Sequence, residues 1–196
     1  VCYNGISVER FAEQRSRSDA ATVFGLGRLI EKKGFGHLIA AVARLRDQGL
    51  AVRCRIGGDG PETESLRQQM EASGLSTQVE LLGSLNESQV RGELRGATCF
   101  VLPCVRAKDG NIDALPTVLL EAQASGCPVI TTRLSGNPEI VVDRVSGLLV
   151  EPGDDDELAR AIREIVSVPA LAERLSVQGR RRAEERCALQ QAARRR

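Results

Sequence analysis

Aromatic residues and histidines are scarce in this sequence. Phe, Trp and Tyr make up 3% of its 196 residues, tryptophan is absent, and His37 is the single histidine. Because single-stranded nucleic acids are bound largely by stacking bases on aromatic side chains, this composition argues against a nucleic-acid partner. The formal net charge of +1 does not indicate a polyanionic partner either. Hydrophobic residues still make up 42% of the chain, so we expect an aliphatic core.

Paired cysteine motifs and long apolar runs are also missing. None of the six cysteines forms a C-x-x-C pair, and with one histidine available no metal site is expected. Four cysteines lie in or beside apolar runs, namely Cys54, Cys99, Cys104 and Cys127. A thiol there behaves as a small buried hydrophobe, with a disulfide framework as the alternative. From the buried thiols we expect a reduced, cytoplasmic setting. No apolar run approaches the roughly 18 residues of a membrane helix, and no signal peptide is visible.

The two ends of the chain differ from its middle. The sequence begins at Val1 without methionine, and residues 1–5 read as the end of a strand entering a turn, so we expect a piece of a longer protein. We expect a single domain with its core at about 4–167, followed by a basic helical segment at 168–196. From Arg174 onward there are eight arginines and two glutamates, a local charge of +6. This favours a solvated helix, with weak contact to an anionic membrane surface as the alternative.

Short apolar runs alternate with helical patterns along the whole chain. Six runs are predicted to be strands, at 21–25, 52–56, 79–82, 99–103, 128–132 and 147–150. Helices are predicted at 36–48, up to 73, at 87–95, 116–125 and 138–142, and from 154 onward. Continuous apolar strands are typical of a parallel sheet buried on both faces. The predicted fold class is therefore α/β, a doubly wound, mostly parallel, six-stranded Rossmann-like sheet that binds ligands beyond the carboxyl ends of its strands.

The loop after the first predicted strand is rich in glycine and then basic, reading Gly25-Leu-Gly-Arg-Leu-Ile-Glu-Lys-Lys-Gly34. Ile30 occupies the third glycine position of a dinucleotide fingerprint, so NAD is not expected. Arg28 and Lys33 suit a phosphate group, Arg through its planar fork and Lys as a point charge. A solvated surface is the alternative for two such cations.

Three further turns have both a structural and a functional interpretation. The run Gly57-Gly-Asp-Gly-Pro61 allows the backbone to approach a ligand, but any sharp strand-to-helix turn needs such glycines. The turn Ser135-Gly-Asn-Pro-Glu139 again follows a strand and could simply start a short helix. The run Asp154-Asp-Asp156 contains a D-x-D pattern, but it begins an amphipathic helix, so capping is favoured over metal binding.

The stretch from Asp113 to Glu121 carries the strongest signal. Pro116 suits the first position of a helix, which leaves the amides of Thr117 and Val118 free at the positive end of the helix dipole as an anion site. Glu121 lies roughly 7.5 Å further along the helix axis. Carboxylates accept hydrogen bonds from sugar hydroxyls and repel phosphates, so both acids should face sugars. Ordinary capping by Asp113 and a surface position for Glu121 are the alternatives.

Five motifs, taken in order, resemble the retaining GT-B glycosyltransferases, the family of glycosyl transferases group 1. They are Gly-Arg-Leu…Lys-Lys-Gly, Gly-Gly-Asp-Gly-Pro, Leu-Pro…Glu-Ala…Ser-Gly-Cys-Pro-Val-Ile, Gly-Asn-Pro-Glu and Gly-Leu-Leu-Val-Glu-Pro-Gly-Asp, between about Asn4 and Ile165. The resemblance implies that this chain is the C-terminal half of a GT-B fold, which binds a nucleotide-sugar donor, and that an N-terminal acceptor domain is absent from it.

The resemblance also assigns roles to residues. Arg28 and Lys33 would grip the donor diphosphate and stabilise it as it departs, which makes them the catalytic residues. Glu121 would bind the ribose, and Asp113, the first acid of the E-x7-E motif, the transferred sugar. The other donor-binding positions implied are Gly27, Gly58, Leu82, Gly83, Ala114, Leu115, Thr117, Val118 and Glu139, with the base near Leu82 and Gly83.

The implied reaction is transfer of a hexose to a glycan or lipid-linked acceptor with retention of configuration, without metal or other cofactor. Without the acceptor domain we expect the chain to be inactive. It departs from the family at two positions, because Asp113 and Ala114 stand where Glu and Gly are usual. A non-catalytic sugar-nucleotide-binding module and a nucleotide-sugar epimerase of related fold are the alternatives.

Overall fold

The computed structural model describes residues 20–194, with side chains as far as Arg186. Six strands form one sheet in the order β3-β2-β1-β4-β5-β6, and every neighbouring pair is parallel. They are β1 (Thr22–Leu26), β2 (Arg53–Gly57), β3 (Val79–Gly83), β4 (Cys99–Leu102), β5 (Val129–Thr132) and β6 (Leu148–Val150). The predicted doubly wound parallel sheet is therefore confirmed. The turn predicted at residues 1–5 lies outside the described residues.

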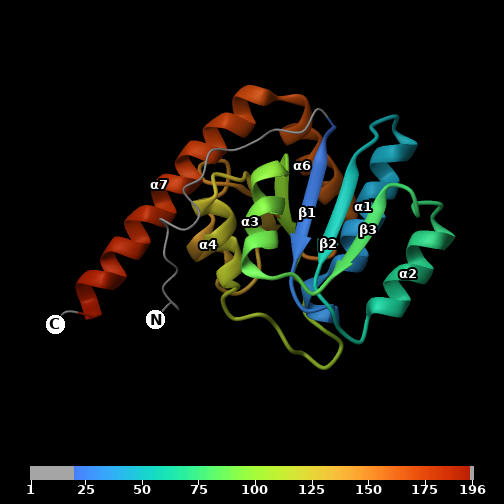
Figure 1. The fold of residues 1–196 in the computed structure, drawn as a ribbon, viewed down its shortest axis with the longest axis horizontal. Helices are drawn as coiled ribbons and strands as arrows, with labels where there is room; N and C mark the ends of the chain where they lie inside the picture. Colours follow the sequence, from blue (N-terminus) through green and yellow to red (C-terminus); the bar gives the residue numbers. More distant parts are fainter. Residues whose placement is uncertain (1–19, 195–196) are drawn as a thin grey trace.

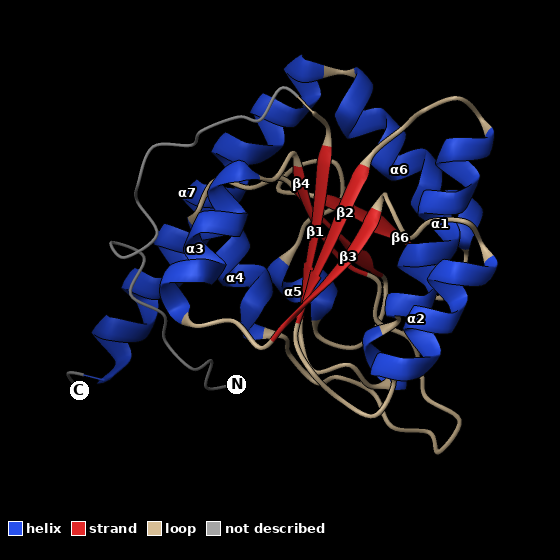
Figure 2. Ribbon diagram, turned by 45° about the vertical axis from the view of Figure 1, so that its right-hand side comes forward, coloured by secondary structure: helices blue, strands red, loops and turns tan. Residues whose placement is uncertain are grey.

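Helices cover both faces of this sheet (Figures 1 and 2). One face carries α1 (Phe35–Asp47), α2 (Thr63–Ala72) and α6 (Asp155–Ser167). The other carries α3 (Glu87–Gly96), α4 (Thr117–Ala124) and α7 (Pro169–Arg194). Two short elements, η2 (Glu31–Lys33) and α5 (Asn137–Ile140), follow β1 and β5. Because β1 pairs with both β2 and β4, the strand order reverses between β1 and β4, the switch point beyond which ligands bind in such sheets.

Local sequence explains where several helices lie and begin. In α1 the residues Leu38, Ile39, Val42 and Leu45 share one face, and each is at most 1% exposed. A capping box starts α3, in which Asn86 and Gln89 bond each other's backbone amides. The Asp154 side chain accepts a hydrogen bond of 2.7 Å from the Glu157 amide at the start of α6, which confirms capping at the D-x-D run. Among the described residues, no group of three or more His, Cys, Asp or Glu side chains could hold a metal ion.

The core is aliphatic, with one edge-to-face aromatic contact between Phe24 and Phe100 at a centroid separation of 5.9 Å. Four cysteines are buried in it as free thiols, Cys54, Cys99, Cys104 and Cys127, so the alternative of a disulfide framework among them is wrong. Burial raises the pKa of the Cys54 thiol to about 12. The four buried thiols pack as small hydrophobic side chains.

The C-terminal helix contributes more to the core than its composition suggests. Leu171, Ala172, Leu175 and Ala183 of α7 are buried, and α7 packs against α4. The core thus extends beyond residue 167, into the segment that the sequence predicts to be a solvated basic helix. The apolar stripe is narrow and is interrupted by arginines, which hides it in the sequence. In the part of the chain that the structure describes, no helix is long and apolar enough to cross a membrane.

Candidate functional site at the carboxyl ends of the strands

Three glycine-rich turns interlock beyond β1, β2 and β3. The Gly27 amide donates to the Gly57 carbonyl at 3.1 Å, and the Gly58 amide donates to the Gly83 carbonyl at 2.7 Å. Gly58 has a φ of +130°, and a Cβ atom there would lie 1.9 Å from the Gly27 carbonyl oxygen. The structure thus brings together Gly27, Gly58 and Gly83, and packing of backbone on backbone explains why Gly58 is glycine.

The turn after β1 lies against the end of β4. Gly34 closes η2 with a φ of +72°, and its amide donates to the Glu31 carbonyl. A Cβ atom at Gly34 would lie 2.0 Å from the Pro103 carbonyl oxygen. This close approach places Lys32 and Lys33 beside the long loop at 104–115, at the switch point of the sheet.

Asp113, in that loop, forms ion pairs with two lysines of η2. Its Oδ2 atom contacts Lys33 Nζ, and its Oδ1 atom lies 3.2 Å from Lys32 Nζ. The three side chains are only 14–22% exposed. Two predicted site residues, Lys33 and Asp113, are therefore in direct contact, and Lys32 joins them although sequence reasoning did not select it. The sequence feature that could have indicated Lys32 is the pair of adjacent lysines before Gly34.

Arg28 occupies the same turn but makes no such contact. Its side chain is exposed, and among the described residues no group forms a hydrogen bond or ion pair with its guanidinium. The guanidinium is thus available to an anionic ligand. A fork of donors without an internal partner is well suited to a phosphate.

The start of α4 differs by one residue from the predicted geometry. Pro116 is the N-cap, with a ψ of 107°, and the helix begins at Thr117, so the prediction of Pro116 at the first helical position is wrong. The Pro116 carbonyl accepts the first hydrogen bond of the helix, from the Leu119 amide at 3.2 Å, which makes Pro116 the N-cap. Proline has no amide hydrogen, and its absence costs nothing at either the N-cap or the first helical position, because neither amide has a partner within the helix. The amides of Thr117 and Val118 have no acceptor in the described part of the chain.

Glu121 lies one turn further along α4 and is half-buried. Burial raises the pKa of this carboxyl, and the nearby Glu87 raises it further. No group in the described part of the chain donates a hydrogen bond to the carboxylate. A half-buried carboxylate without donors is an acceptor site that hydroxyl groups of a ligand can fill.

Other predicted residues are held by the turn after β5. The Ala114 carbonyl accepts hydrogen bonds from the Gly136 amide at 3.1 Å and from Ser135 Oγ at 3.2 Å. A Cβ atom on Gly136 would also meet the Leu115 side chain at 2.5 Å. Glu139 is placed differently, because its backbone carbonyl accepts hydrogen bonds from Arg182 and Arg186 of α7. Leu82 lies on β3 and is partly exposed beside Gly83.

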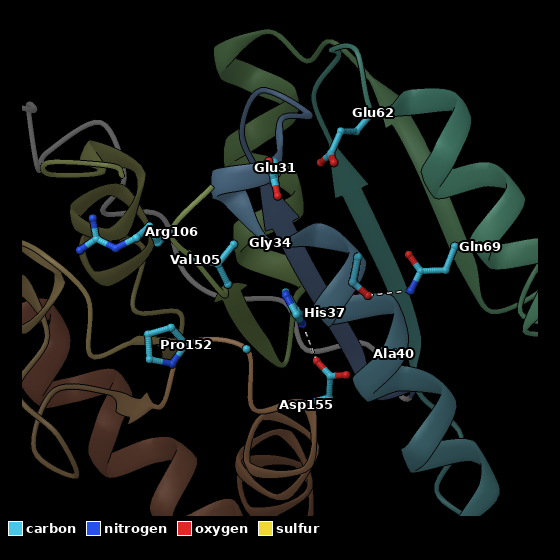
Figure 3. Close-up of a pocket in the computed structure, with 12 residues that line it drawn as sticks. Glu31, Gly34, His37, Ala40, Glu62, Gln69, Val105, Arg106, Pro152 and Asp155 are labelled. Atoms are coloured by element: carbon cyan, nitrogen blue, oxygen red, sulfur yellow. Dashed lines mark hydrogen bonds and ion pairs between the residues drawn. The ribbon is translucent and has the colours of Figure 1, made fainter. Parts of the chain in front are cut away.

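A hollow of about 600 Å³ lies between α1, α2, the loop that follows β4 and the start of α6 (Figure 3). The residues that line it are Glu31, Gly34, Gly36, His37, Ala40, Glu62, Gln69, Val105, Arg106, Pro152, Gly153 and Asp155. His37 Nδ1 lies 2.7 Å from Asp155 Oδ1, which accounts for the single histidine as part of a surface pair. Burial, and then Glu31, raise the pKa of Glu62. With three carboxylates in its wall, this hollow is less suited to a diphosphate than the turn that carries Arg28 and Lys33.

Comparison with known proteins identifies a family that this chain matches. Residues 8–182 match the family model of glycosyl transferases group 1. The chain is 37% identical over 160 residues to the putative colanic acid biosynthesis glycosyltransferase WcaL of Escherichia coli K12. The aligned region covers 81% of this chain and 39% of that protein. The chain spans less than half the length of this and similar curated relatives.

Two solved structures show the same fold. Anabaena Alr3699/HepE in complex with UDP-glucose has a TM-score of 0.81 and 22% identity, covering 94% of this chain and 52% of that one. The C-terminal domain of the group 1 protein LpcC from Francisella tularensis has a TM-score of 0.77 and 23% identity, covering 92% of this chain and 97% of that one. On the match of 175 consecutive residues to its model, the chain belongs to the glycosyl transferases group 1 family.

Proposed function

We propose that this chain binds the nucleotide-sugar donor of a retaining hexosyltransferase. The observation that carries the proposal is the cluster at the switch point, in which Asp113 is paired with Lys33 of the turn that also carries the exposed Arg28. The free amides of Thr117 and Val118 begin the helix that follows the same loop. Cations and free amides suit a diphosphate, while the carboxylates suit the hydroxyl groups on either side of it.

The charges of this cluster fit such a donor. Arg28, Lys32 and Lys33 are cations, and Asp113 neutralises one of them, so an excess of two positive charges remains. The diphosphate of a nucleotide sugar carries one negative charge on each phosphate. A fixed positive site that is partly shielded from water stabilises this charge most when it grows, as the sugar–phosphate bond breaks.

In this proposal each acid binds one sugar of the donor. Glu121 accepts hydrogen bonds from the ribose hydroxyls, and Asp113 accepts them from the transferred sugar. The base lies near Leu82 and Gly83, and Gly27, Gly58, Ala114 and Leu115 form the backbone surface around the donor. Glu139 remains a predicted contact, with its backbone held by α7.

The proposed reaction transfers the sugar with retention. The bond from the anomeric carbon to the β-phosphate oxygen breaks, and the acceptor hydroxyl forms its bond on the same face as its proton passes to the departing phosphate. Arg28 and Lys33 stabilise the diphosphate that leaves. We expect no metal or other cofactor, because these cations do the work of one.

The names of similar proteins support this proposal. A structural neighbour is described in complex with UDP-glucose, and a curated relative is named for biosynthesis of a polysaccharide, colanic acid. We therefore propose a polysaccharide or lipid-linked glycan as acceptor, bound with the help of a further domain. A cytoplasmic location, with contact between the basic C-terminal segment and a membrane surface, remains a prediction.

Calorimetric titration of the chain with UDP, GDP and ADP tests the proposal. At least one nucleotide should bind, and Arg28→Ala and Glu121→Ala should each weaken binding about 10-fold or more. Arg67→Ala is the matched control, since Arg67 is an exposed arginine of α2 whose ion pair is with Glu64 of the same helix. A folded chain that binds none of the three, or binds equally well with Arg28 or Glu121 removed, contradicts the proposal.

A further inference from the structure

Lys32 holds the Asp113 loop at three points. Its backbone carbonyl accepts a hydrogen bond of 3.0 Å from the Val105 amide at the start of the loop. Its Nζ atom lies 3.4 Å from Asn111 Oδ1 and 3.2 Å from Asp113 Oδ1 at the end of the loop. This residue therefore fixes both ends of the loop to the turn that follows β1.

The two lysines contact different oxygens of the same carboxylate. Lys33 pairs with Oδ2 of Asp113, and Lys32 pairs with Oδ1. Only Lys32 has a further side-chain partner in the described part of the chain, Asn111. Lys32 is thus tied to the loop by two side-chain contacts, whereas Asp113 is the one side-chain partner of Lys33 among the described residues.

Binding of a diphosphate would change the ion pairs that these lysines form. If Lys33 turns toward the phosphates, as the proposed function requires, it must give up part of its contact with Asp113. A carboxylate that is 15% exposed is costly to leave without a cation. Lys32 is placed to remain on Oδ1 through this exchange, because its other contacts, with Val105 and Asn111, are within the loop itself.

We propose that Lys32 is the positioning residue for Asp113. It keeps this carboxylate paired and oriented toward the transferred sugar while Lys33 contacts the diphosphate. The inference rests on the proposed function and deepens it. It predicts that Lys32 contributes to binding of the transferred sugar, through Asp113, and that binding of the diphosphate does not depend on Lys32.

The test compares nucleotides with and without the sugar. UDP and UDP-glucose, GDP and GDP-mannose, and ADP and ADP-glucose are titrated into the wild-type chain, and the pair that binds is carried forward. For Lys32→Ala we expect the dissociation constant of the nucleotide sugar to rise about 10-fold and that of the nucleoside diphosphate to rise less than about 3-fold. Lys32→Arg should restore most of the loss, because a cation of similar reach is restored.

Two further variants separate positioning from folding. Lys108→Ala removes a cation from the same loop that has no contact with Asp113, and it should leave both dissociation constants unchanged. Asp113→Asn should lose the same sugar-dependent part of affinity, and adding Lys32→Ala to it should cause little further loss. Thermal unfolding of each variant is followed in parallel, so that general destabilisation appears as an equal loss for both ligands.

The possible results are distinct. If Lys32→Ala weakens both ligands equally, or neither, or if Lys32→Arg fails to restore sugar binding, the inference is overturned while the proposed function stands. If the wild-type chain binds no nucleotide, the proposed function fails, and this inference fails with it.

Discussion

Gly34 lies so close to Pro103 that a single added methyl group could not fit between them. A Cβ atom on Gly34 would be 2.0 Å from the Pro103 carbonyl oxygen, and the φ of +72° disfavours any other residue. This contact joins the turn after β1 to the end of β4. The positions of Lys32, Lys33 and the loop at 104–115 all depend on it.

Gly34→Ala should therefore destabilise the chain strongly. We expect the free energy of unfolding in urea to fall by at least about 3 kcal/mol, from the clash and the strained φ together. Gly49→Ala is the control, because Gly49 has a similar φ of +79° but nothing within 4 Å of an added Cβ. It should lose only about 1–2 kcal/mol. Equal losses in the two variants would show that the contact with Pro103 is unimportant.

Glu121→Gln should make the chain more stable at neutral pH while it weakens nucleotide binding. Burial, and then Glu87, raise the pKa of the Glu121 carboxyl above its ordinary value of 4.5. The folded chain therefore holds this proton more tightly than the unfolded chain does. Stability from Glu121 is present at acid pH and is lost as the pH rises from about 4.5 through the raised pKa.

Urea unfolding of both proteins between about pH 4 and pH 7 measures this effect, and the gain of the Gln variant should grow across that range. Glutamine does not titrate, so its stability should fall less as the pH rises. A Gln variant that is less stable than the wild type at pH 7 would mean that the carboxylate has a stabilising partner, contrary to the structure.

Leu175→Ala should show that α7 is part of the folded core. Leu175 is fully buried, and truncating such a side chain typically lowers the free energy of unfolding by about 2–5 kcal/mol. Val177→Ala, two residues later on the exposed side of the same helix, should change it by less than about 0.5 kcal/mol. If the two variants unfold at the same urea concentration, α7 does not pack as described.

The chain by itself should bind nucleotide without transferring sugar. In the proposed function an acceptor hydroxyl must reach the anomeric carbon, and a further domain supplies the acceptor site. Release of nucleoside diphosphate from UDP-glucose, GDP-mannose and ADP-glucose, with glycan acceptors present, should remain at the rate without protein. Steady release dependent on both acceptor and chain would contradict this expectation.

The sequence alone was enough to predict the sheet, because most of its strands are short runs rich in apolar residues. The first four, β1 to β4, also end at or just before a glycine or proline. The prediction was weaker where stability comes from distant parts of the chain. The buried side of α7 is a line of a few small and aliphatic residues between arginines, so its burial depends on the α4 surface against which it packs. The N-cap at Pro116 was missed by one residue because proline is tolerated on both sides of a helix start.

The candidate site shows the same division. Sequence motifs selected Arg28, Lys33, Asp113 and Glu121, whose residue types suit phosphates and hydroxyls. They could not show that Lys33 and Asp113 touch, because that contact requires the loop at 104–115 to fold onto η2. Lys32 was overlooked for the same reason, because its contact with Asp113 also depends on how that loop folds.

The interlocked turns at Gly27, Gly58 and Gly83 limit how this surface can change. Their contacts are made by main-chain atoms, so they do not depend on any side chain that a substitution could replace. At Gly58 any larger residue would force the turns apart. Variation of this surface, whether by evolution or by design, is therefore confined to positions outside these three turns. Ala114 is such a position, because its side chain is exposed while its carbonyl carries the contacts with the turn after β5, so a substitution there can alter the surface and leave those contacts in place.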